Sequence, residues 1–162
     1  MNSLRQSVIV LVLIIAGGAA AIAKPRLPDW VEHAVEQPAP PKRDGEEPAF
    51  EVLWDEAHYE VLDNGRVNKT VPYALRILDL KERWRARAQC TYYASSGTRP
   101  KIKAWTLHSD GDVYKYKRSD EQETTNSSYL TLETETRTVT ISGWSETRTG
   151  DVFAYEYTTT ES

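Results

Sequence analysis

Cys90 is the only cysteine in the sequence, so it is the one candidate for a thiol nucleophile. A thiolate becomes reactive when a base lies beside it, and the available bases are His33, His58 and His108. Cys90, however, falls on the apolar side of a segment in which apolar and polar residues alternate. That position favours a buried, unreactive thiol. We therefore predict no catalytic residue and no enzymatic activity.

The carboxylates Asp55, Glu56, Glu60 and Asp63 are close enough in sequence for general acid and base chemistry. They stand at a strand end and beside a turn, however, where solvated charge is common. The histidines are scattered and form no short His or Cys spacing typical of zinc sites. We therefore predict no metal site and no cofactor.

Arg83, Arg85 and Arg87 are spaced two residues apart, which in a strand places three guanidinium groups on one exposed face. One interpretation is a solvated face whose arginines pair with acidic residues of the next strand. The other is a site for an anionic ligand or a partner. These three arginines are the candidate ligand-binding residues of the chain.

The tyrosines Tyr92, Tyr93, Tyr155 and Tyr157 suggest two further alternatives. Exposed rings could stack on a sugar, whereas rings that pack in the core or at an interface are the commoner case. The overall composition includes five Trp and nine Tyr but only two Phe. Large amphipathic rings of this kind suit strands better than helices.

The elements that must position these residues are predicted from alternating apolar and polar residues. In residues 83–92 the even positions are apolar, so Trp84, Ala86, Ala88 and Cys90 are expected to face the core. The same alternation predicts strands at residues 102–107, 138–144 and 151–157.

Turn signals separate the predicted strands. Asn64-Gly65 and Asp110-Gly111 are typical of hairpins, and the polar residues 119–128 are expected to form an exposed loop. Seven or eight strands without regular crossover helices predict an all-β fold. The expected architecture is an antiparallel immunoglobulin-like β-sandwich.

The N-terminal residues have the parts of a secretory signal. Arg5 precedes an apolar run over residues 8–15, and the small residues Ala21 and Ala23 follow. We expect cleavage after Ala23 and a periplasmic or secreted protein, attached to a membrane only if the segment stays uncleaved. The predicted organisation is a signal peptide (1–23), a Pro-rich linker (24–48) and a β-sandwich domain (49–162). The linker is expected to be extended, with at most one helical turn near Trp30, which could pack on the domain.

The formal charge of −4 argues against a nucleic-acid-binding protein, whose surface is normally basic. A single cysteine cannot form an intramolecular disulfide, so the exported domain must be stable through its core.

Several motifs occur in an order that resembles a known family. They are Pro28-Asp29-Trp30, residues 50–56, Asp63-Asn64-Gly65, residues 73–78, residues 102–107 with Asp110-Gly111, and residues 150–157. Over residues 30–158 the chain resembles the domain of unknown function that lies N-terminal to a transglutaminase-like domain in many exported bacterial proteins. In that family a papain-like Cys/His/Asp domain follows. Its catalytic residues have no matching positions here.

The resemblance implies a non-catalytic exported module that binds protein or serves as an accessory to a transglutaminase-like domain. A carbohydrate-binding module is one alternative. Another is a subunit of an enzyme whose transglutaminase-like part is encoded separately. Because the family's chain continues beyond the last predicted strand, we also expect an unmatched strand edge that favours self-association or pairing with a partner protein.

Overall fold

The computed structural model describes residues 26–38, 48–95, 97–126 and 136–161. The expected signal peptide, residues 1–23, lies outside the described residues. No helix among the described residues is long and apolar enough to cross a membrane. The elements, in chain order, are α1 (Asp29–Glu36), β1 (Phe50–Asp55), β2 (His58–Val61), β3 (Val67–Ile77), the 3-10 helix η1 (Leu80–Arg85), β4 (Arg87–Tyr93), β5 (Lys101–Leu107), β6 (Val113–Lys115), the 3-10 helix η2 (Arg118–Asp120), β7 (Glu121–Asn126), β8 (Thr136–Ser142) and β9 (Val152–Glu161).

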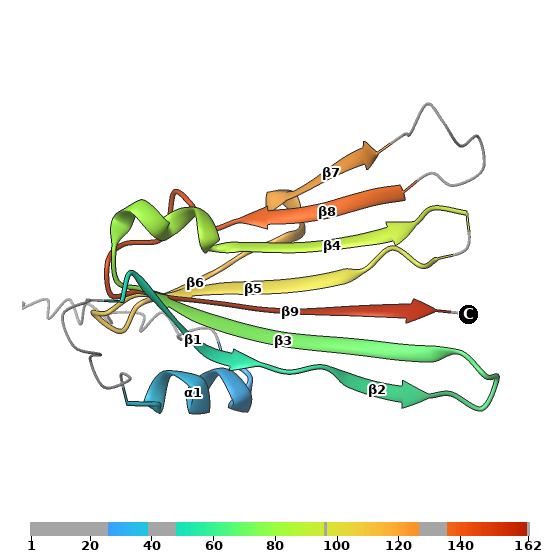
Figure 1. Ribbon diagram of the computed structural model, residues 1–162, viewed down its shortest axis with the longest axis horizontal. Helices are drawn as coiled ribbons and strands as arrows, with labels where there is room; N and C mark the ends of the chain where they lie inside the picture. The colour runs from blue at the N-terminus through green and yellow to red at the C-terminus, as the bar shows by residue number, and fades with distance from the viewer. Residues whose placement is uncertain (1–25, 39–47, 96, 127–135, 162) are drawn as a thin grey trace, which may run out of the picture.

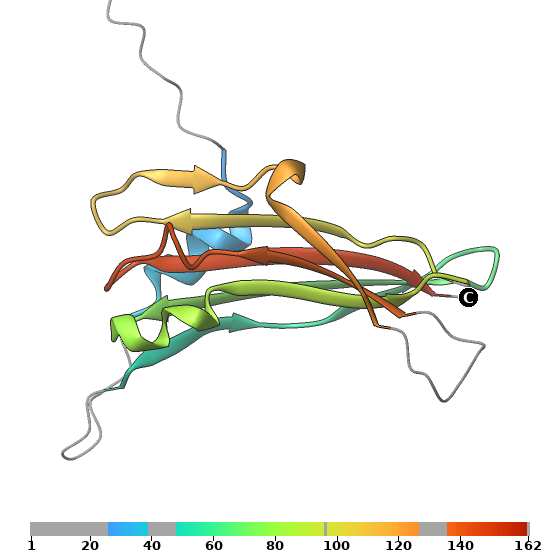
Figure 2. The same cartoon turned by 90° about the horizontal axis from the view of Figure 1, so that it is seen from above.

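The strands form two antiparallel sheets (Figure 1). One has six strands, in the order β1-β3-β9-β5-β6, with β2 also paired to β3. The other has three strands, in the order β4-β8-β7. Strands β4 and β5 run side by side in Figure 1, but Figure 2 shows that the three-stranded sheet lies over the larger one. The prediction of an antiparallel all-β sandwich is therefore confirmed.

The main core lies between the two sheets. Its residues include Ala88 and Cys90 of β4, Ala86 just before that strand, and Phe153 of β9. Ala88 and Phe153 are fully buried, and Cys90 is 6% exposed. The alternation of apolar residues therefore gave the correct inward face for three of the four residues expected there.

Trp84 is the exception, because it does not lie in a strand. The chain forms η1 from Leu80 to Arg85, and the strand starts only at Arg87. The Asp79 side chain accepts a hydrogen bond from the backbone N–H of Lys81 at 2.9 Å and so caps η1. As a result Trp84 is 51% exposed.

A second core lies on the opposite face of the six-stranded sheet, where α1 packs (Figure 1). Val31 and Ala34 of the helix are fully buried. The ring of Trp30 contacts Trp54 and Trp105, with centroids 6.3 and 6.4 Å apart. The expectation of an extended, solvated linker is wrong for this segment. Apolar residues spaced three and four apart give the helix a buried face that outweighs the flanking prolines.

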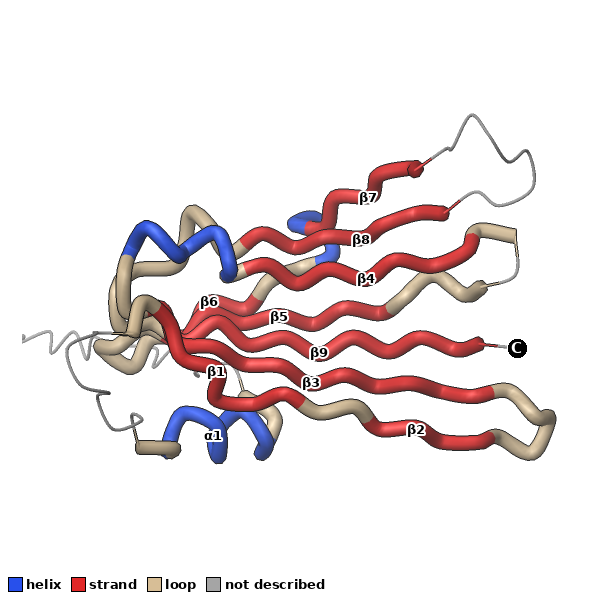
Figure 3. The backbone as a smooth tube through the Cα atoms, in the orientation of Figure 1, coloured by secondary structure: helices blue, strands red, loops and turns tan. Residues whose placement is uncertain are grey.

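Both predicted hairpins are present (Figure 3). The turn between β2 and β3 places Gly65 at a φ of 79°, and the turn between β5 and β6 places Gly111 at a φ of 89°. Residues with a side chain rarely adopt such angles. The polar segment expected to be a loop instead begins with η2 and continues as β7, which pairs with β8.

The final strand β9 lies in the middle of its sheet. It pairs with β3 from Val152 to Glu161 and with β5 from Val152 to Thr158. An unmatched edge at the last strand was therefore the wrong expectation. Two long neighbours satisfy its backbone hydrogen bonds on both sides.

Candidate functional site

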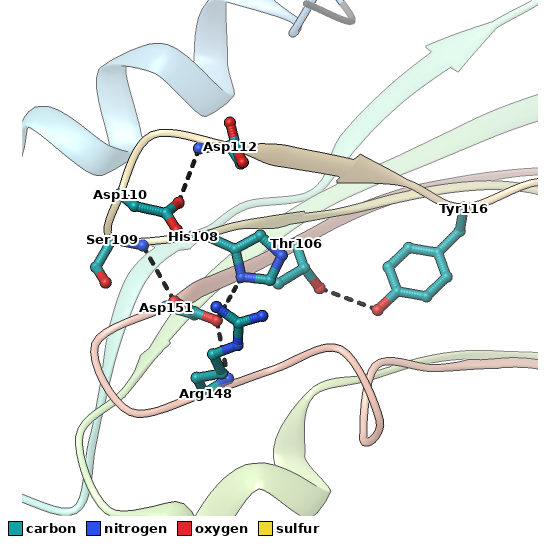
Figure 4. A network of polar contacts seen from close by, with 8 residues as sticks. All are labelled: Thr106, His108, Ser109, Asp110, Asp112, Tyr116, Arg148 and Asp151. Carbon is teal, nitrogen blue, oxygen red and sulfur yellow. Dashed lines mark hydrogen bonds and ion pairs between the residues drawn. The ribbon is translucent and has the colours of Figure 1, made fainter.

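The two turns at one end of the six-stranded sheet meet at Asp151 (Figure 4). β5 ends at Leu107 and β9 begins at Val152, and these two residues are paired. The register therefore places His108, just after β5, close to Asp151, just before β9. Gly150 adopts a φ of 89°, which turns the chain into the strand.

The Asp151 side chain is 1% exposed and accepts three hydrogen bonds. Its Oδ2 atom accepts from Nδ1 of His108 at 2.8 Å and from the backbone N–H of Arg148 at 2.8 Å. Its Oδ1 atom accepts from the backbone N–H of Ser109 at 3.1 Å. Because an ionised carboxylate can only accept hydrogen bonds, Nδ1 of His108 carries the proton. The side chain thus fastens the turn before β9 to the hairpin after β5.

An Asp–His pair is also the part of a catalytic triad that orients the base. Such a triad needs a nucleophile within hydrogen-bond reach of the second imidazole nitrogen. Within the described ranges, no hydroxyl or thiol contacts that nitrogen of His108. Cys90 is buried between the sheets instead. The three hydrogen bonds satisfy the buried carboxylate of Asp151. Its burial is therefore explained by a structural role.

A buried hydrogen bond of 2.9 Å joins Thr106 Oγ1 and the Tyr116 hydroxyl close to this network (Figure 4). Tyr116 is 7% exposed, and its ring packs edge-on against Phe153. Burial raises the pKa of Tyr116 to about 12, because the ionised form would lose its hydration.

A cleft of about 660 Å³ lies between α1 and the β5–β6 hairpin. Its charged lining is mixed, with Arg26, Glu32, Arg76 and Asp112. Arg76 already pairs with Glu51 at 3.0 Å and donates to the backbone carbonyl of Val35 at 3.3 Å. Among the residues that the structure describes, no group of three His, Cys, Asp or Glu side chains could hold a metal ion.

The three candidate arginines do not share one strand face. Arg83 and Arg85 belong to η1, and only Arg87 belongs to β4. The premise of a period-two row is therefore wrong, because the cap at Asp79 starts a 3-10 helix where the sequence alternation predicted a strand. Whether these arginines bind a ligand stays a prediction.

Two of the arginines instead stack on aromatic rings. The Arg83 guanidinium lies 4.3 Å from the centroid of Trp144. The Arg85 guanidinium lies 4.0 Å from Phe50 and 4.4 Å from Trp84, and it pairs with Glu82 at 2.6 Å. We call Phe50, Arg83, Trp84, Arg85 and Trp144 the Trp–Arg surface. Both tryptophans are about half exposed, at 51% for Trp84 and 45% for Trp144.

The tyrosines considered as a sugar platform mostly pack against the core. Tyr92, Tyr155 and Tyr157 contact the main core cluster, and the last two rings are stacked at 6.4 Å. Burial also raises the pKa of Tyr155. The Tyr92 hydroxyl donates to Glu123 at 2.6 Å, and this bond lowers the pKa of the Glu123 carboxyl. Only Tyr93 points outward, with 55% exposure.

The carboxylates proposed for acid and base chemistry are exposed at Asp55, Glu56, Glu60 and Asp63. Glu56 pairs with His58 at 3.0 Å, and Glu60 accepts from Asn68 at 3.2 Å. Both contacts lie on the surface of the hairpin. Sequence reasoning missed the Trp–Arg surface, although the Asp79 and Glu82 spacing is a helix-start signal that could have revealed η1.

No family model matches the sequence, and no curated protein matches it either. Among solved structures, the fold is similar to part of a Parabacteroides distasonis protein described as a "putative protease". The TM-score is 0.62 at 12% sequence identity, and the match covers 70% of this chain and 23% of that chain. The matched part of this chain thus spans less than a quarter of that protein's length. At this identity the likeness concerns the fold alone.

Proposed function

We propose that the chain is a non-catalytic, exported β-sandwich module that binds protein, as an accessory to a transglutaminase-like domain. The observation that supports this most is the Trp–Arg surface. Tryptophan and arginine are the residues that most often dominate the binding energy of protein interfaces. Here two half-exposed tryptophans are each held by a stacked guanidinium.

The arrangement of the surface suits a preformed binding site. The stack fixes each ring and each guanidinium in one position, so little side-chain entropy is lost on binding. The Arg83 guanidinium stacks on Trp144 and forms no ion pair with any described residue, so no described carboxylate binds its N–H groups. It can therefore donate to a carboxylate or a carbonyl of a partner.

We propose that the chain has no catalytic activity because of the surroundings of the Cys90 thiol and of the Asp151–His108 pair. Cys90 is enclosed by the sandwich core, which leaves its thiol inaccessible to a substrate. Asp151 accepts three structural hydrogen bonds and holds His108 between two turns.

Carbohydrate binding is the second candidate, because exposed tryptophan rings stack on sugars. Trp84 and Trp144 have the required exposure. Each ring, however, has a guanidinium within 4.4 Å of its centroid. One face of each ring is thus already occupied, which favours the protein-binding function. The immunoglobulin-like type of the sandwich and the export of the chain stay predictions.

A photoreactive amino acid in place of Trp84 tests the proposal in producing cells. Position 122 on β7, an exposed glutamine, is the matched control. We expect light to link position 84 to one protein with a transglutaminase-like domain, while position 122 gives no such product. Purified chain should show no turnover of peptide, ester or amine-transfer substrates. Products with glycan, or equal products from both positions, would contradict the proposal.

A further inference from the structure

Strand β4 forms one edge of the three-stranded sheet. It pairs with β8 along its whole length, from Arg87 to Tyr93, and with no other described strand. The pairing is regular, without a bulge, and the strand contains no proline. Apart from the Tyr93 carbonyl, which accepts from the backbone N–H of Gly97 at 2.8 Å, this edge offers a row of backbone groups with which another strand can pair.

The opposite edge of that sheet is protected. Strand β7 carries Glu121 and Glu123, which pair with Arg99 at 2.7 and 2.9 Å. Both glutamates stand opposite the core residues Val139 and Ile141 of β8 and so lie on the inner face of the sheet, where Glu121 is partly buried and Glu123 is exposed. Inward-pointing charges are a common device against the addition of a further strand.

The edges of the six-stranded sheet are protected as well. β1 has an irregular register between Val52 and Trp54. β2 has four residues and β6 only three. β6 pairs only with residues 105–107 of β5, and the part of β5 that β6 leaves uncovered carries Lys101 and Lys103. By contrast, β4 turns only uncharged side chains inward, so it is the one unprotected edge among the described strands.

The larger sheet is wider than the smaller sheet that covers it. The registers place the following residues on the same face as Tyr155, which packs in the main core: Val52, Tyr59, Val61, Val67, Val71 and Tyr73. We call these six residues the inner strip. Val52 is 45% exposed, Tyr59 65% and Val61 74%. Apolar side chains thus lie uncovered on the face that elsewhere forms the core.

The inner strip lies next to the free edge of β4. The Arg99 pairs place β7 over the β5 side of the large sheet. Strand β4, at the other edge of its sheet, contacts β9. The next strand beyond β9 is β3, followed by β1 and β2. A strand added to β4 would therefore lie over the inner strip.

We propose that β4 and the inner strip bind an extended segment of a partner polypeptide, which adds a fourth strand to the three-stranded sheet. Backbone groups of β4 would supply the pairing, and the inner strip would take alternate apolar side chains. This inference rests on the proposed protein-binding function, but it uses a different surface and names the form of the partner.

The partner segment is a single strand and not a second copy of this chain. A second copy paired through its own β4 would bring a second protruding six-stranded sheet into the space already filled by β1, β2 and β3. The charges beside the inner strip are mixed, because Lys69 lies over the Tyr59 ring at 5.7 Å and Asp55 stands opposite Tyr73 in the register. The partner segment is therefore selected by alternating apolar side chains and not by its charge.

The test uses a blocked synthetic peptide of the sequence Glu-Val-Thr-Val-Glu-Val-Thr-Val-Glu, titrated into the purified chain and followed by NMR. We expect saturable binding and slower amide exchange in residues 87–93, as β4 gains a partner. Replacing Tyr59 and Val61 together by serine should weaken binding about tenfold or more, since their apolar contact is lost. Tyr114→Ser, on β6, is the control and should bind like the wild type.

Three outcomes would overturn the inference: no binding at about 1 mM peptide, binding without slower exchange in β4, or equal affinity for a peptide of the same composition in which the valines are grouped. A peptide with lysine in place of glutamate should bind with similar affinity, since both a basic and an acidic side chain lie beside the inner strip. The test does not involve the Trp–Arg surface. Its failure would therefore leave the crosslinking result at position 84 unaffected, and the reverse also holds.

Discussion

The imidazole of His108 and the carboxylate of Asp151 are 43 residues apart in sequence and 2.8 Å apart in the fold. Their hydrogen bond joins the turn after β5 to the turn before β9, the central strand of the large sheet. Two backbone N–H groups bind the same carboxylate. The contact therefore holds one end of the sandwich together.

Asp151→Asn should destabilise the protein by about 1.5–3 kcal/mol, because an amide cannot accept all three hydrogen bonds and one donor loses its partner. Urea unfolding measures the loss. Asp112→Asn is the matched control, since that side chain is exposed, and it should change the stability by less than about 0.5 kcal/mol. Equal losses in the two variants would show that the buried contact contributes nothing.

Strand β4 allows a direct test of which face is buried. Ala88 is fully buried and Gln89 is exposed. Ala88→Glu places an unpaired charge in the core and should cost at least about 3 kcal/mol. Gln89→Glu should stay within about 0.5 kcal/mol of the wild type. Similar unfolding midpoints for the two variants would mean that the face assignment is wrong.

The strands were predictable where one face is buried and the other solvated. β4, β5 and β8 show a clear alternation in sequence, and their registers place those apolar residues in the cores. Asn64-Gly65 and Asp110-Gly111 were equally clear, since few residues tolerate the positive φ found there. These features depend on local sequence alone.

The errors arose where a local contact competes with the pattern. The cap of Asp79 on η1 turns residues 80–85 into a 3-10 helix, which changes the positions of Arg83, Trp84 and Arg85. Helix α1 was hidden by the flanking prolines, because its stability comes from packing on Trp54 and Trp105. The partnership of His108 with Asp151 depends on the register of β5 and β9, which a single sequence does not reveal.

Stability at high pH should depend on Tyr116. Tyrosine in the unfolded chain ionises near pH 10, whereas burial raises the pKa of Tyr116 to about 12 in the folded state. Between these values the unfolded state has lost the proton that the folded state keeps. The free energy of unfolding must therefore decrease as the pH rises from about 10 to about 12.

Tyr116→Phe should make this decrease less steep, although part of it remains because burial also raises the pKa of Tyr155. The variant also loses the hydrogen bond to Thr106, so its stability at neutral pH should be lower. Denaturant unfolding at a series of pH values gives both quantities. The exposed Tyr59→Phe serves as the control. An unchanged slope for Tyr116→Phe would contradict the burial of its hydroxyl.

The most direct test of the account is the affinity of the protein recovered at position 84 for variants of the Trp–Arg surface. Trp84→Ala and Trp144→Ala should each weaken binding by about 2 kcal/mol, roughly thirtyfold, as expected for interface residues that dominate the binding energy. Tyr114→Ala, an aromatic residue of similar exposure on β6, should bind like the wild type. Circular dichroism confirms that each variant is folded. Unchanged affinity in both tryptophan variants would contradict the central claim.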